Sequence, residues 1–91
     1  MFILIKCYER DIEIVEKYHE EKDAKIGLLN DMLLAFKEKD DDYYTKQIQE
    51  IKEKVINNRD MYFEDGDIGV FCQVAWWNGK GENYDWKICE I

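Results

Sequence analysis

The chain has 91 residues, which suffices for one domain with a thin hydrophobic core. Apolar residues make up 46% of the sequence and aromatic residues 14%, which excludes a disordered chain despite 37% charged residues. The net charge of −8 argues against direct binding to nucleic acid or an anionic membrane and favours partners with basic surfaces, although solubility alone also accounts for such a charge.

The chain opens with two predicted strands. Residues 2–9 (FILIKCYE) are short, β-branched and apolar on both sides, which is typical of a central strand. A charged turn over residues 9–11 follows, and the next segment alternates so that Ile12 and Ile14 lie on one side. We expect a hairpin here, with the opening of a helix as the alternative for its second half.

Two predicted helices come next. From Glu20 apolar residues recur at spacings of three and four, and Gly27 within this stretch indicates the close approach of another backbone. We expect the acidic triplet at residues 40–42 to lie near the first turn of the second helix, which ends near residues 57–58, and the two helices to pack antiparallel. The apolar stripes are Ala24, Leu28, Leu29, Met32, Leu33 and Phe36 in the first helix and Tyr44, Ile48, Ile51 and Val55 in the second.

The C-terminal third predicts further strands. A short strand near residue 62 turns at Asp65–Gly66, a long strand covers residues 67–77, and a glycine-bearing loop leads into a closing strand at residues 84–91. The predicted fold class is α+β: a small four-stranded antiparallel sheet in the order β-β-α-α-β-β, with an antiparallel helix pair on one face. Residues 1–91 form a single domain.

The tryptophans lie around the last predicted loop. In a continuous strand Val70, Cys72, Val74 and Trp76 would share one face, and Trp77 would point to the other. A sheet covered on one face only would leave one indole exposed, and we assign Trp77 to partner binding. The alternative is a pocket for a nucleotide, with a lysine for the phosphate, or simply a core. That ligand site would consist of Trp76, Trp77, Tyr84, Trp86 and Lys87.

Two acidic clusters are the second candidate for a binding surface. A row of carboxylates can imitate the phosphates of a nucleic acid and occupy a basic channel. The competing interpretation is a solvated face with helix-end stabilisation, since lysines lie among the acids. The clusters, which we assign to partner binding, are Glu38 with Asp40, Asp41 and Asp42, and Glu64 with Asp65 and Asp67.

Motifs for catalysis and metal binding are absent from the sequence. Cys7, Cys72 and Cys89 have no CxxC spacing, which predicts free thiols in a reducing compartment. The single histidine, His19, shares no metal-ligand spacing with them, and EDGD at residues 64–67 fits a turn better than a calcium loop. We expect no cofactor, no metal and no enzymatic activity. The start lacks a signal-like leader and no apolar run could span a membrane, so we expect a cytoplasmic protein.

Two segments resemble a known group of proteins. LIKCYERDI and AWWNGKGENYDWKICEI are similar to the ends of small uncharacterised proteins encoded by phages and integrated elements of low-GC Gram-positive bacteria. The group's closing segment runs A-W-x-N, a short loop, then D-W-K-I. That pattern falls here on residues 75–78 and 85–88; Trp77 and the long preceding strand depart from it, and the helices do not share it.

The resemblance implies a context and transfers no catalytic residue. Small acidic phage proteins often bind a host protein, and inhibitors of nuclease-based defence are one class. We therefore expect a non-enzymatic inhibitor in the host cytoplasm that blocks the basic surface of a nucleic-acid-handling defence protein, such as a CRISPR effector. The alternatives are a protein that sequesters a nucleotide signal, and a homo-oligomeric structural protein, for example a homodimer, that associates through Ile26, Leu34 or the bare sheet face.

Overall fold

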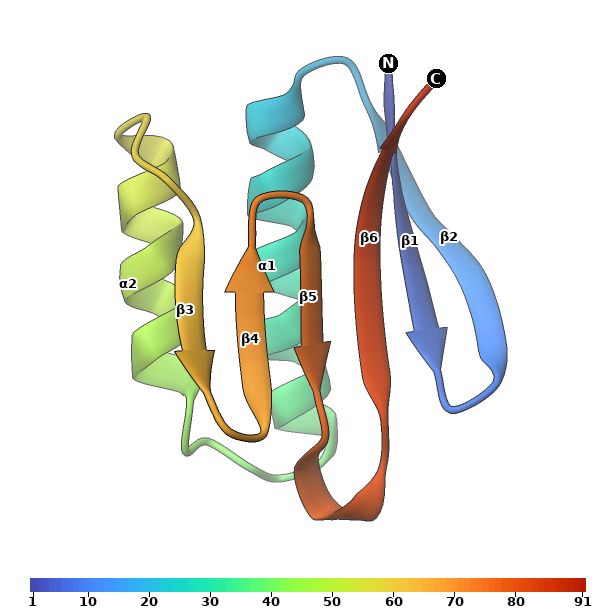
Figure 1. Ribbon diagram of the computed structural model, residues 1–91, viewed down its shortest axis with the longest axis vertical. Coiled ribbons are helices and arrows are strands. Elements are labelled where there is room, and N and C mark those ends of the chain that lie inside the picture. The colour runs from blue at the N-terminus through green and yellow to red at the C-terminus, as the bar shows by residue number, and fades with distance from the viewer.

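The computed structural model describes residues 1–91 and has two layers, a sheet and a helix pair (Figure 1). All six strands form one antiparallel sheet in the order β2-β1-β6-β5-β4-β3, and both helices lie against the same face. The elements are β1 (Phe2–Tyr8), β2 (Asp11–Tyr18), α1 (Glu21–Glu38), α2 (Thr45–Ile56), β3 (Tyr62–Asp65), β4 (Ile68–Phe71), β5 (Val74–Trp77), the 3-10 turn η1 (Gly79–Gly81) and β6 (Tyr84–Glu90).

The predicted four-stranded sheet is wrong, although the α+β class holds. The stretch predicted as one strand over residues 67–77 is a hairpin, because a two-residue turn at Cys72 and Gln73 separates β4 from β5. Cys72 adopts a left-handed backbone there, with φ of 55°. Neither residue belongs to the types that usually mark turns, so the sequence carried little signal for this reversal. β3 then pairs with β4 and completes six strands.

This reversal decides which side chains share a face. Phe71 and Val74 are direct partners across the hairpin and therefore lie on the same side of the sheet. Trp76 lies on that side too, whereas Trp77 pairs with Ile68 and points to the helices. The predicted grouping of Val70 with Trp76 is consequently wrong. A continuous strand alternates without interruption, and the turn shifts that alternation.

The hydrophobic core lies between the helices and the sheet. Tyr84 is stacked between three neighbours, at ring-centroid distances of 4.5 Å to Tyr8, 5.3 Å to Trp77 and 5.5 Å to Trp86. Phe36 of α1 meets Trp77 edge to face at 4.7 Å. Burial of such large side chains contributes about 1.5–3 kcal/mol each. The helices add Ala24, Leu28, Leu29, Met32, Ala35 and Phe36 from α1 and Ile48, Ile51 and Val55 from α2.

One polar contact ties α1 to the centre of the sheet. The Trp86 indole Nε1–H donates to an Asp31 carboxylate oxygen at 2.7 Å, and the Lys6 ammonium lies 3.5 Å from the same oxygen. Only 12% of the Lys6 side chain and 11% of the Asp31 side chain are exposed. The ion pair therefore stabilises a largely desolvated indole and fixes the height of α1 over β1 and β6.

The predicted N-terminal hairpin and both helices are confirmed. The β1–β2 register shifts by one residue between Leu4 and Ile5, which leaves Val15 as the extra residue of a bulge. Gly27 of α1 admits the Tyr18 ring, so the close neighbour is a side chain and not a backbone. Asn58 ends α2 with a φ of 62°, as expected of a terminating asparagine. Neither helix is long and apolar enough to cross a membrane.

Candidate functional site

The loop between α1 and α2 holds the acidic triplet in a fixed backbone. The Asp40 N–H donates to the Lys37 carbonyl at 3.1 Å and the Asp41 N–H to the Phe36 carbonyl at 2.9 Å. Asp40 has a φ of 53°, so residues 36–41 form a Schellman ending of α1. The Lys80 ammonium donates to the Lys39 carbonyl at 2.7 Å, which anchors this end of the helix to η1.

The three aspartates of this loop do not stabilise the start of α2. The helix begins at Thr45, its first turn contains no acidic residue, and no side chain caps it. This part of the prediction is wrong because Tyr43 and Tyr44 separate Asp42 from Thr45, where the first helical turn begins and the dipole acts. Only Asp41 accepts a local hydrogen bond, from the Tyr43 N–H at 3.1 Å. The carboxylates of Asp40 and Asp42 make no hydrogen bond or ion pair within the chain.

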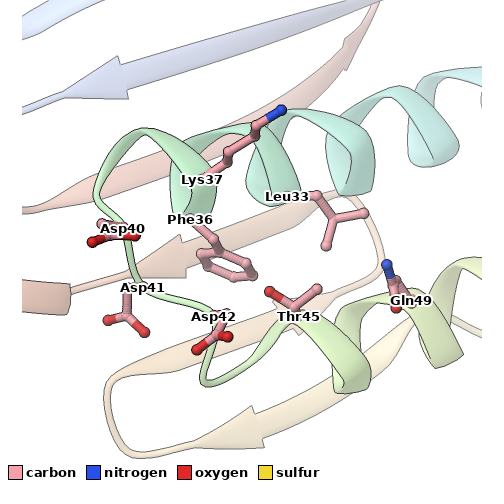
Figure 2. A pocket seen from close by; sticks show the side chains of 8 residues that line it. All are labelled: Leu33, Phe36, Lys37, Asp40, Asp41, Asp42, Thr45 and Gln49. Atoms are coloured by element: carbon pink, nitrogen blue, oxygen red, sulfur yellow. The ribbon is translucent and has the colours of Figure 1, made fainter.

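A hollow of about 450 Å³ lies where α1 ends and α2 begins. Figure 2 shows the loop carrying Asp40, Asp41 and Asp42 around the Phe36 ring, with Thr45 on α2 facing it. The remaining lining residues are Leu33, Lys37 and Gln49. The hollow therefore combines an apolar base with aspartates at its rim, whose side chains point outward from the loop in Figure 2.

A second hollow of about 490 Å³ joins the two acidic clusters that the sequence predicts. Asp41 from the α1–α2 loop and Asp65 and Asp67 from the β3–β4 turn line it together. These residues are 24 and 26 positions apart in the sequence, so the fold alone brings them to one end of the molecule. The other lining residues are Tyr43, Tyr44, Trp77, Gly79 and Lys80.

Two tyrosines lie beside the carboxylates of this hollow. Partial burial raises the pKa of Tyr44, and the charges of Asp65 and Asp67 raise it further. Tyr43 is 71% exposed and meets the Tyr44 ring edge to face at 4.8 Å. An aromatic ring thus stands in water beside carboxylates. We define the acidic end surface as Asp40, Asp41, Asp42, Tyr43, Asp65 and Asp67.

Three residues assigned to partner binding lie outside this surface. Glu38 is exposed at the end of α1 and lines neither hollow, and Glu64 pairs with Gly69 on the far side of β3. Trp77 is only 1% exposed and belongs to the core. Its assignment as an exposed anchor is wrong, and Tyr43 is the exposed aromatic residue that the sequence analysis missed. The signal was its place in the loop directly after the aspartates.

The predicted nucleotide pocket is not assembled. Trp77, Tyr84 and Trp86 stack inside the core and are 1–2% exposed, so they offer no face to a ligand. Trp76 and Lys87 lie on the opposite side of the sheet. None of the five main hollows is lined by more than one of these five residues.

The uncovered side of the sheet carries the second candidate surface, which we call the open face. Trp76 lies there with its ring over Gly69, which has no side chain to displace it. Two rows of paired residues cross all six strands. The first row is Ile14, Ile5, Lys87, Val74, Phe71 and Tyr62. The second is Ile12, Cys7, Asp85, Trp76, Gly69 and Glu64.

Large apolar side chains of the open face meet water directly. The exposed fractions are 74% for Ile12, 59% for Ile14, 58% for Tyr62 and 52% for Phe71. An antiparallel sheet with one free face normally turns polar side chains toward solvent. Contiguous apolar patches on a small protein mark interaction sites more often than not.

Other reactive groups are scattered. The three cysteines are free, and no three His, Cys, Asp or Glu side chains are arranged to hold a metal ion. At the sheet end next to η1, hydrogen bonds to Glu82 and Tyr8 raise the pKa of Lys39, and the hydrogen bond from Lys39 is the main cause that lowers the pKa of Glu82. This network joins α1 to β1 and to the segment before β6.

Comparison with protein families, curated proteins and solved structures gave no match to this chain.

Proposed function

We propose that the protein is a non-enzymatic binding module whose acidic end surface binds a basic surface of another protein. The observation that carries this proposal is the convergence of Asp41, Asp65 and Asp67 around one hollow, with Tyr43 exposed at its rim. Carboxylates that line a common hollow attract a guanidinium or ammonium group. An adjacent exposed ring adds contact area and a cation–π partner.

The partner class that fits best is a nucleic-acid-binding protein. Its basic groove is built for phosphates at close spacing and for stacked bases, and the acidic end surface presents charges beside an aromatic ring in a similar way. With a net charge of −8 the chain is steered toward such a groove and away from nucleic acid itself. The similarity to small phage proteins makes bacterial defence nucleases, such as guide-loaded CRISPR effectors, the first class to test.

The proposed binding has two components with separate kinetic effects. Long-range attraction from the carboxylates speeds encounter and weakens as salt screens it. The Tyr43 ring, once it is desolvated in the groove, slows dissociation. Lys80 also lines the hollow, but its ammonium is held by the carbonyls of Lys39 and Asp40, so its charge is partly directed into the helix end.

The test is displacement of a labelled oligonucleotide from guide-loaded effectors, measured at several salt concentrations. We expect the wild type to displace it and to lose affinity as salt rises. The triple variant Asp41→Asn, Asp65→Asn and Asp67→Asn should bind at least about tenfold more weakly, mainly through slower association. Tyr43→Ala should dissociate faster.

The matched control removes three charges elsewhere, through Glu13→Gln, Glu50→Gln and Glu90→Gln, all at exposed positions outside the acidic end surface. This control should retain most of the affinity. Equal losses in the two triple variants would reduce the effect to net charge and contradict a localised site. A salt-independent affinity would contradict electrostatic recognition altogether.

A further inference from the structure

The two rows of the open face carry three charged residues: Asp85 and Lys87 at the centre and Glu64 on the edge strand β3. Asp85 and Lys87 lie two residues apart on β6, one in each of the two rows, and both are exposed. Neither takes part in any of the three ion pairs of the chain. A second surface that covers this face must therefore offer a positive group opposite Asp85 and a negative group opposite Lys87.

The open face of a second copy supplies these two groups. When two copies are related by a twofold axis that lies between the sheets and perpendicular to the strands, β6 of one copy runs antiparallel over β6 of the other. An axis at the level of Trp86 then places Asp85 of each copy opposite Lys87 of its mate. An axis parallel to the strands would instead oppose like charges. The face is thus complementary to itself in one orientation, as an isologous interface requires.

The acidic end surfaces select the same orientation. They lie at the end of the molecule where the α1–α2 loop and the β3–β4 turn meet (Figure 1). The perpendicular axis sends the two acidic ends to opposite poles of the pair, whereas the parallel axis would place both at the same end. Each chain carries a net charge of −8, so separation of these ends reduces repulsion.

The size of the face suits a stable dimer. The molecule measures 33 × 28 × 19 Å, and its sheet lies across the two longer dimensions, which sets an upper limit of roughly 900 Å² on the face, of the order of the ~800 Å² per partner of a standard interface. Two sheets packed face to face with side chains interdigitated at about 10 Å are a common architecture.

Association through the sheet edges is disfavoured. β2 is one edge strand, and it carries a bulge at Val15 together with charged residues at positions 13, 16 and 17. β3 is the other, and it has four residues and ends in Glu64 and Asp65. Bulges, charges and shortness all protect edges from pairing. The open face is therefore better suited to self-association than either sheet edge.

We infer that two copies of this chain form a face-to-face homodimer in which the open faces are buried and Asp85 of each protomer pairs with Lys87 of the other. Trp76 is enclosed at this interface. The dimer carries one acidic end surface at each pole, so it presents two binding sites that point in opposite directions.

Sedimentation equilibrium at several protein concentrations tests this inference with charge reversals. The wild type should dimerise, and Asp85→Lys or Lys87→Asp alone should raise the dissociation constant at least about tenfold, because each leaves like charges opposed twice. An equimolar mixture of the two variants should form a heterodimer, since all four charges are then paired. A variant that failed to fold could not be restored by mixing, so the mixture separates pairing from misfolding.

The control reverses charges on the outer side of α2, with Glu50→Lys and Lys54→Asp, which change the net charge by the same amounts. These variants should associate like the wild type, alone and mixed. A wild type that stays monomeric at every concentration would overturn the inference and leave the face for a different protein. A dimer whose dissociation constant is unchanged by the substitutions at residues 85 and 87 would overturn it as well. So would an equimolar mixture of the two variants that fails to dimerise.

Discussion

The two faces of the sheet carry side chains of similar chemistry in opposite surroundings. On the helix-covered face Trp77 and Trp86 are each 1% exposed, and the indole N–H of Trp86 has a carboxylate partner. On the open face Phe71 is 52% exposed and Trp76 has only Gly69 beneath it. Hydrophobicity alone therefore does not distinguish core from surface in this chain. The covering layer does, and the open face lacks one within a single copy.

The largest difference between the two faces is expected when one indole on each face is truncated and the losses of stability are compared. Trp77→Ala should lower the free energy of unfolding by about 3–5 kcal/mol, because the side chain is fully packed between Phe36 and Tyr84. Trp76→Ala should cost about 1 kcal/mol or less at low protein concentration. Urea denaturation of both variants measures the difference, and similar losses would mean that the open face is as well packed as the core.

The next largest effect concerns the carboxylate under α1. Asp31→Ala leaves the Trp86 N–H and the Lys6 ammonium without a partner in a largely buried site, so we expect a loss of about 2–3 kcal/mol. Asp85→Ala on the open face, as a monomer, should change stability by about 0.5 kcal/mol or less. Thermal unfolding followed by near-ultraviolet circular dichroism compares the two. A mild effect at residue 31 would show that the ion pair does not support the core.

The third contrast uses alkaline pH. Burial raises the pKa of Tyr84 to about 12 from an ordinary value near 10, so the folded state retains a proton that the unfolded state has released. The contribution of Tyr84 to the free energy of unfolding is fully present below pH 10. It is lost as the pH rises from about 10 toward 12, a decrease of roughly 2–3 kcal/mol. Tyr84→Phe should flatten the fall in urea midpoint over this range. Tyr62→Phe, at an exposed position on the open face, should not.

The smallest expected effect comes from a substitution at Gly69, beneath the Trp76 indole. A Cβ added at Gly69 would overlap the Trp76 ring, so Gly69→Ala should push the indole away from the sheet. We expect a stability loss of about 1 kcal/mol or less and an emission shift to longer wavelength as this indole becomes more hydrated. An unchanged spectrum would contradict the placement of the indole over this glycine.

Periodicity in the sequence predicts the hairpin, both helices and the closing strand, because long repeating patterns identify elements well. It fails where one turn lies inside an apolar run. The turn at Cys72 and Gln73 has no glycine, proline, asparagine or aspartate, and its left-handed residue is a cysteine. This reversal divides one predicted strand into β4 and β5 and exchanges Trp76 and Trp77 between the faces. The sixth strand, β3, corresponds to the short strand predicted near residue 62, which the predicted four-stranded sheet left out.

The candidate surfaces were predictable only in part. The sequence singles out the aspartates at residues 40–42 and at residues 65 and 67 as two acidic clusters, but their convergence depends on the position of the α1–α2 loop relative to the β3–β4 turn. No local pattern encodes that contact. The open face depended on the correct strand count, because the alternation of β5 has meaning only once its register with β4 is known.

The contrast between the covered and the open face is tested most directly by fluorine NMR of the protein labelled with 5-fluorotryptophan. Of the three resonances, we predict that only that of Trp76 shows a marked shift between H₂O and D₂O in dilute solution. As the protein concentration rises, this resonance should lose that sensitivity, and those of Trp77 and Trp86 should stay unchanged. A solvent response from Trp77 or Trp86, or a Trp76 resonance that is indifferent to both solvent and concentration, would contradict the account.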